Sequence, residues 1–340
     1  MTEVGTSDNS NNDSVNHPPG SFSSDIPPSD NPSSDIPPSD NPSSDSPPSD
    51  VPSSDSPPQG NQLPDTPPPD SLSLDSPLPE NLLPRSRSML VAEVWIILSL
   101  SLGAAAVYAV LDLLQSLLVA KVPLNHQVAV INSAFAPNME LLDLAYQLVG
   151  IATALAPVAL VAYLFKKERE SKSIIGLDAV GLDISQPKQD ILWGCVLAAV
   201  IGGAGIGFYL LAFHAGFDVN VVPTNLPPSW WRIPVLILQA AEDGILEEVV
   251  VCGYLLRRLD QLGWGENTAL VTSAVLRGSY HLYQGFGGFI GNLIMGLIFG
   301  RIYQRRKRVA PLAVAHFLID AVAFVGYVEL VGKVSFLPHP

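Results

Sequence analysis

Long apolar runs constrain this chain more than any other feature, because about 20 such residues can cross the hydrocarbon core of a membrane. Backbone polar groups in lipid must be satisfied within the segment, so each run is expected to be an α-helix. The expected helices lie near residues 90–120, 141–165, 189–214, 233–257, 267–284, 287–303 and 309–331. The sequence therefore predicts an all-α fold, a polytopic membrane helix bundle of about seven transmembrane helices. Buried helices of a soluble protein are the alternative, and so many long runs do not favour it.

The first 88 residues have a different composition. They hold 14 acidic and two basic residues, and the ten-residue stretch that begins at Asp25 recurs at Asp35. Such a segment, rich in proline, serine and aspartate, cannot bury enough apolar surface to offset its chain entropy. We expect a disordered tail over 1–88, more a solvated spacer than a partner-binding arm, followed by a transmembrane helical domain over 89–340. No cleaved signal peptide is expected at Met1, where a charged stretch followed by a short apolar stretch is missing.

Basic residues predict the orientation of the helices, because loops on the cytoplasmic side are enriched in lysine and arginine. With seven helices, the basic clusters all fall on one side: Arg85 and Arg87, Lys166 to Lys172, Arg257 and Arg258, and Arg301 to Arg308. We expect an integral protein of the cell (plasma) membrane whose N-terminal tail is cytoplasmic.

Ionisable side chains recur inside three of the apolar segments. Glu247 and Glu248 are adjacent in one segment, His281 lies near the end of the next, and His316 and Asp320 lie in the last. An ionisable group at the centre of a bilayer costs about 2.5 kcal/mol or more, so such groups usually have a function. The three segments therefore predict a polar site inside the membrane.

The acidic pair suggests hydrolytic chemistry. A buried carboxylate beside a histidine is a candidate general base toward water, and we interpret Glu247 as that base. Glu242 and Asp243 precede the pair, and for these two we favour a polar packing network or the lining of a water-filled cavity.

The histidines differ in how much they indicate. His281 alone could simply lie at a membrane interface. His316 and Asp320 are spaced i,i+4, which places both on one helix face, where the carboxylate could hold the imidazole in one tautomer. A local pair that satisfies only itself is the alternative.

Three short motifs carry a family resemblance. They are Glu247-Glu248-Val-Val-Val-Cys252, Arg277-Gly278-Ser279-Tyr280-His281 and His316-Phe317-Leu318-Ile319-Asp320. In order and spacing they resemble the motifs E-E-x-x-x-R, aromatic-x-x-x-His and His-x-x-x-Asn or Asp of the CAAX protease and bacteriocin-processing family (CPBP or Abi). That family comprises intramembrane glutamic proteases, also called type II CAAX prenyl endopeptidases. The resemblance covers about residues 140–330.

Two positions depart from the family pattern. Cys252 stands where the family has arginine, and Arg277 stands where it has an aromatic residue. The family arginine is thought to order the acidic pair. A buried guanidinium needs an acidic partner, so we expect Arg277 to take over this role by pairing with Glu248 or Glu247.

The resemblance implies an intramembrane endopeptidase. Its implied catalytic residues are Glu247, Glu248, His281, His316 and Asp320, with Arg277 in support. Glutamate chemistry without a required metal is expected, although one glutamate and two histidines are acceptable zinc ligands. A catalytically silent scaffold or sensor is the main alternative, and a proton-coupled transporter is a weaker one. The expected partners are membrane lipid and a peptide or lipidated-peptide substrate, with no nucleic acid.

Overall fold

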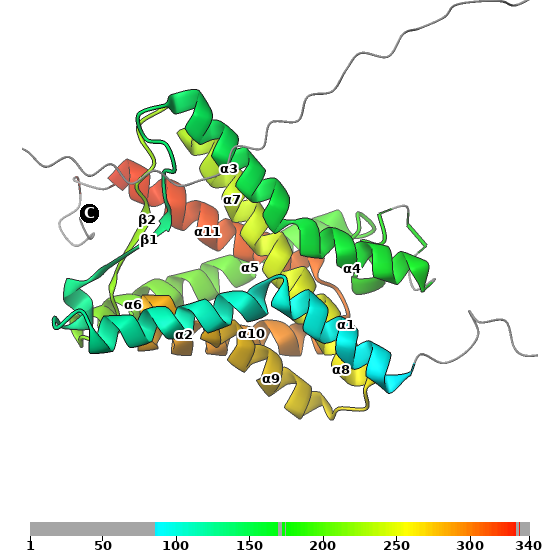
Figure 1. Cartoon of the computed structure of the whole chain (residues 1–340). Helices are drawn as coiled ribbons and strands as arrows, with labels where there is room; N and C mark the ends of the chain where they lie inside the picture. Colours follow the sequence, from blue (N-terminus) through cyan, green and yellow to red (C-terminus); the bar gives the residue numbers. More distant parts are fainter. Residues whose placement is uncertain (1–85, 169–171, 174, 331–332, 334–340) are drawn as a thin grey trace, which may run out of the picture. The chain divides into compact units, whose positions relative to one another are not determined.

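The computed structural model describes residues 86–168, 172–173, 175–330 and 333. The expected disordered tail lies outside this part of the chain, apart from residues 86–88. The described part is nearly all-α, as predicted, with one small sheet (Figure 1). Its α-helices are α1 (Arg87–Ser99), α2 (Leu102–Leu118), α3 (Glu140–Ala154), α4 (Ala156–Lys167), α5 (Pro187–Leu197), α6 (Gly203–His214), α7 (Arg232–Glu247), α8 (Leu256–Gln261), α9 (Glu266–Ser279), α10 (Phe286–Arg306) and α11 (Ala310–Leu330).

Each of the seven predicted segments is helical, but the count of seven membrane spans is not confirmed. Four described helical segments are long and apolar enough to cross a membrane: 140–167, 187–214, 286–306 and 310–330. The pair α1 and α2, bent by 52°, would make a fifth. The other two segments have clear reasons to fall short. The one that begins with α7 carries four acidic residues, and α9 has 14 residues, about 21 Å of helix against roughly 30 Å of hydrocarbon.

Close packing of α7 against α11 brings two of the predicted motifs together. In Figure 1, α7 runs between α3 and α11, and it packs against both. A Cβ atom added at Gly244 would lie 2.9 Å from the backbone nitrogen of Phe317 and 3.0 Å from the carbonyl oxygen of Ala313. Only glycine permits this approach. One turn beyond Gly244, α7 ends at Glu247, and the next residue, Glu248, contacts His316.

The helix widens directly after Glu247. The segment Glu248–Leu255 (η5) is a π-helix, and it joins α7 to α8 without a break. A π-helical turn holds an extra residue and shifts the side chains that follow it around the helix axis, and such turns are frequent at functional sites. The residues of η5 are all buried, so this wide turn lies in the interior of the bundle.

A short turn between α9 and α10 positions His281. The chain leaves α9 at Ser279 and forms a 3₁₀ turn, Leu282–Gln284 (η6), that begins just after His281. Gly285 follows with φ 114°, a conformation that favours glycine. The chain therefore turns near Gln284 to Gly288, and His281 lies beyond the end of α9 instead of within the predicted helix over 267–284.

Asp218 fixes this turn from the loop before the second strand. Its Oδ1 accepts hydrogen bonds from the backbone N–H groups of Gly287, at 2.7 Å, and Gly288, at 3.1 Å. Burial raises the pKa of the Asp218 carboxyl above its ordinary value, and the two N–H groups oppose that shift. Asp218 thereby satisfies free N–H groups in the first turn of α10.

We expect Asp218→Ala to destabilise the protein by about 1–3 kcal/mol, because the buried N–H group of Gly287 and the partly buried one of Gly288 lose their acceptor. Asp218→Asn retains a carbonyl oxygen and should lose less. Thermal unfolding of the purified variants in detergent measures the difference. Equal unfolding temperatures for the alanine variant and the unaltered protein would contradict this role.

Candidate functional site

Arg277 lies at the centre of a buried polar cluster. It is in the last turn of α9 and its side chain is 0% exposed. Its Nη2 lies 3.2 Å from Glu247 Oε2, donates to Glu248 Oε1, and lies 3.0 Å from His316 Nδ1. The guanidinium carbon is 5.4 Å from the centre of the Phe299 ring on α10, a cation–π distance. One cation thus joins the two helices that carry the acids and the second histidine.

The two oxygens of Glu247 have different surroundings. Oε2 accepts a hydrogen bond of 2.7 Å from the Tyr280 hydroxyl and also faces Arg277. Oε1 lies 3.7 Å from His281 Nε2, which is longer than a hydrogen bond. The carboxylate is therefore held on one side and has no direct partner at hydrogen-bond distance on the other.

Both ring nitrogens of His316 contact a carboxylate. Nδ1 lies 2.9 Å from Glu248 Oε1, and Nε2 lies 3.3 Å from Asp320 Oδ2. The second contact follows from the i,i+4 spacing on α11 that the sequence indicated. Glu248 Oε1 therefore contacts both Arg277 and His316, so Glu248 helps to hold these two side chains in place.

The six residues that the sequence singled out lie in one cluster, built from α7, η5, α9, the turn after α9, and α11. The expected pairing of Arg277 is present with both glutamates. Asp243 also lies close enough to Asp320 for their carboxyl groups to interact. The roles assigned to these residues stay predictions.

Tyr280 was missed by the sequence reasoning, although it lies inside the second motif. Its side chain is buried and its hydroxyl donates to Glu247. A signal was present, since a buried phenol needs a hydrogen-bond partner and Tyr280 directly precedes His281.

Cys252 is buried in η5, one turn beyond Glu248. It lies close enough to Glu248 and Arg277 to interact with both electrostatically. The arginine of the family motif would therefore extend into the space that Arg277 reaches from α9.

Several polar atoms of the cluster are buried without a partner. Within the described residues, His281 Nε2, Glu248 Oε2, and Arg277 Nε and Nη1 have no hydrogen-bond partner. Buried polar groups normally find a protein or water partner, so water or a substrate group is expected to satisfy them. Among the described residues, no group of three or more His, Cys, Asp or Glu side chains is placed to hold a metal ion.

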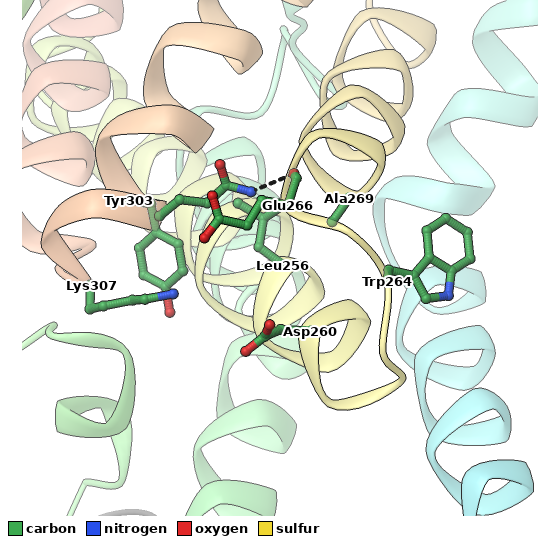
Figure 2. Close-up of a pocket in the computed structure, with 8 residues that line it drawn as sticks. Leu256, Asp260, Trp264, Glu266, Ala269, Tyr303 and Lys307 are labelled. Carbon is green, nitrogen blue, oxygen red and sulfur yellow. Dashed lines mark hydrogen bonds between the residues drawn. The ribbon is translucent and has the colours of Figure 1, made fainter.

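Two hollows lie outside the cluster itself. One of about 30 Å³ lies beside the connection from α8 to α9 and is lined by residues that include Asp260, Trp264 and Lys307 (Figure 2). It has room for water but not for a peptide. The other, of about 380 Å³, is open and apolar and lies between α7 and α11. Its lining includes Phe317 and Ala321, the sequence neighbours of His316 and Asp320.

Comparison with known families agrees with the motifs. Residues 228–322 match the family model described as type II CAAX prenyl endopeptidase Rce1-like. This range contains the acidic pair, Arg277, both histidines and Asp320, and over these residues it confirms the resemblance that the three motifs indicated. No curated protein and no solved structure is similar enough to give a match. The family and the long apolar helices together indicate an integral membrane protein of the CAAX-protease type.

We expect Tyr280→Phe to lower the cleavage rate about tenfold, which corresponds to the roughly 1.4 kcal/mol of one hydrogen bond to a charged group. The ring still fills its buried space, so the unfolding temperature should change little. Tyr283→Phe, which removes a neighbouring phenol that contacts Gln284, serves as the control. A Tyr280→Phe variant with an unchanged rate and pH profile would show that the hydroxyl does not position Glu247.

Proposed function

We propose that this protein is an intramembrane glutamic endopeptidase that hydrolyses a peptide bond with a water activated by Glu247 and His281. The observation that carries the proposal is the asymmetry of Glu247. Oε2 is held by Tyr280 and Arg277, while Oε1 faces an unpartnered His281 Nε2 at 3.7 Å. A water molecule can contact both atoms at hydrogen-bond distance.

The reaction then follows from these two groups. Glu247 takes a proton from the water while His281 orients it, and the water oxygen bonds to the carbonyl carbon of the substrate. The protonated Glu247 next delivers its proton to the amide nitrogen, and the carbon–nitrogen bond breaks to leave a carboxylic acid and an amine. General acid–base catalysis of this kind contributes about 10²–10⁴-fold to a rate.

His316 and Asp320 are proposed to stabilise the negative charge that develops on the substrate oxygen. Glu248 occupies Nδ1 of His316, so only the Nε2 side, shared with Asp320, can donate to a substrate. A fixed donor in a water-poor site is effective for this purpose. Arg277 and Tyr280 are positioning residues, because both act through Glu247.

The proposed substrate is a peptide that carries a lipid group. The open hollow between α7 and α11 supports this, since its lining is apolar and it adjoins His316 and Asp320 in sequence. The name of the matched family points to prenylated peptides. We further propose that no metal is required, that lipid is the other partner, that nucleic acid is not bound, and that the protein acts in the cell membrane with its N-terminal tail in the cytoplasm.

A cleavage assay with the purified full chain in lipid nanodiscs tests the proposal. The probe is a fluorescence-quenched peptide with a farnesylated CAAX-type C-terminus, compared with the same peptide without the farnesyl group. We expect cleavage of the farnesylated peptide, with a lower KM than the unmodified one, and retention of activity after treatment with a metal chelator. If neither peptide is cleaved, the result counts against the proposal.

A catalytically silent scaffold is the second candidate, favoured by one observation. The charged groups of the cluster largely satisfy one another, with Arg277 bonded to both glutamates and His316 between two carboxylates. A scaffold predicts that Glu247→Gln has no effect on the peptides of a membrane fraction. An endopeptidase predicts products that disappear in that variant, so comparative proteomics of membranes separates the two.

A further inference from the structure

The two-stranded sheet is closed along one edge. It consists of β1 (Val128–Asn132) and β2 (Asn220–Thr224), which run parallel. On the outer edge of β2, the N–H group of Val221 donates to the Tyr209 hydroxyl at 3.0 Å, and Pro223 has no N–H group. A capped donor and a proline prevent a further strand from pairing there.

The outer edge of β1 is open. Val128 pairs in register with Asn220 and Val130 with Val222, and the Asn220 N–H donates to Gln127. This pattern directs the backbone groups of Val128 and Val130 away from β2. In the part of the chain that the structure describes, neither residue has a hydrogen-bond partner on that side. Val128 is 53% exposed, so the edge is accessible.

The open strand shares two apolar clusters with sequence neighbours of the proposed catalytic residues. Ala129 packs in the same apolar cluster as Leu282, the residue after His281. Ile131 packs in another cluster with Phe317 and Ala321, the residues after His316 and Asp320. The side chains of Ala129 and Ile131 lie on one face of β1, because side chains two residues apart in a strand point to the same side. Both clusters therefore link β1 to the elements that carry the histidines.

We propose that the open edge of β1 binds an extended segment of the peptide substrate as a third strand and holds its scissile bond beside His281 and His316. The inference rests on the proposed function and specifies how the substrate is held. An added strand would bond to the N–H and C=O groups of Val128 and Val130, whose spacing suits an extended chain and no other conformation. Main-chain bonds of this kind tolerate many side chains, which suits a protease.

Val130→Pro tests the edge directly. Proline removes the outward N–H group, leaves the bonds from Ala129 to β2 in place, and is tolerated on edge strands. With the farnesylated peptide as probe, we expect kcat/KM to fall roughly 10- to 100-fold, mainly through KM. Val130→Ala keeps the backbone donor and is the matched control, expected within about twofold of the unaltered chain. Equal activity of the proline variant would overturn the inference.

Single N-methyl groups along the peptide give a second test that needs no change in the protein. An added strand predicts that methylation of alternate amides blocks cleavage, in a pattern of period two. Cleavage without that pattern would overturn the edge while leaving the proposed peptidase intact.

A third measurement does not depend on cleavage. p-Benzoylphenylalanine in place of Val128, in the Glu247→Gln background, should crosslink the farnesylated peptide even if the unaltered chain does not cleave it. A crosslink to the peptide would support binding at the edge of β1. A crosslink together with no cleavage by the unaltered chain would also count against the proposed peptidase. Crosslinking to a second copy of the chain, or no crosslink at all, would overturn the inference.

Discussion

Glu247→Gln should lower peptide cleavage about 10²–10⁴-fold, the range attributed to a positioned general base. Glutamine has the same shape and can still accept the hydrogen bond of Tyr280, but its amide cannot take a proton from water. The fold should therefore survive a change that removes the chemistry. Cleavage of the farnesylated peptide and thermal unfolding, measured on the same preparation, report the two effects separately.

Glu242→Gln is the matched control for that variant. Glu242 is a buried acid on the same helix, and we assign it to a packing network or to the lining of a cavity, so its variant should keep activity within a few-fold. If both variants lose activity equally, the loss reflects general damage to α7. If Glu247→Gln is fully active, Glu247 is not the general base, and the interpretation of the protein as a scaffold gains support.

The candidate site was predictable from the sequence because lipid penalises its components individually. Glu247, Glu248 and Arg277 each need a partner in an apolar segment, so segments that carry such groups must meet. Together with the family resemblance, in which Cys252 replaces the motif arginine, this argument predicted the contact between Arg277 and the glutamates about 30 residues away, and the structure contains it. It needed no knowledge of crossing angles or of loops.

Other features depend on tertiary structure that a hydropathy pattern does not contain. α9 ends at Ser279, before the turn that Asp218 anchors from a distant loop, so the predicted helix over 267–284 was too long. The predicted count of seven spans is not confirmed. The β1–β2 pair was also missed. Its strands are five residues each and are separated by several helices, so no local signal joins them.

Arg277 is the residue on which the cluster depends most. It is fully buried and contacts Glu247, Glu248 and His316. No other lysine or arginine contacts either glutamate within the described residues. Two adjacent carboxylates in the interior of a membrane protein repel one another and lose hydration, and a shared guanidinium offsets both effects.

We expect Arg277→Ala to abolish cleavage and to destabilise the protein by about 3–5 kcal/mol, because it leaves buried carboxylates without a cation. Thermal unfolding and peptide cleavage are the measurements. Arg301→Ala, which removes a partly exposed arginine that pairs with Glu266, is the control and should cost no more than about 1 kcal/mol.

Adding Cys252→Arg to the Arg277→Ala variant should restore part of both stability and activity. The new side chain would start one turn beyond Glu248 on η5 and extend into the space that Arg277 vacates, beside both carboxylates. It would also recreate the family motif E-E-x-x-x-R. Rescue by Cys252→Arg, with no rescue by Cys252→Leu, would show that a cation is needed at this place and that either helix can supply it. A fully stable and active Arg277→Ala variant would instead show that the acidic pair needs no cation, and the substitution of Arg277 for the motif arginine would be wrong.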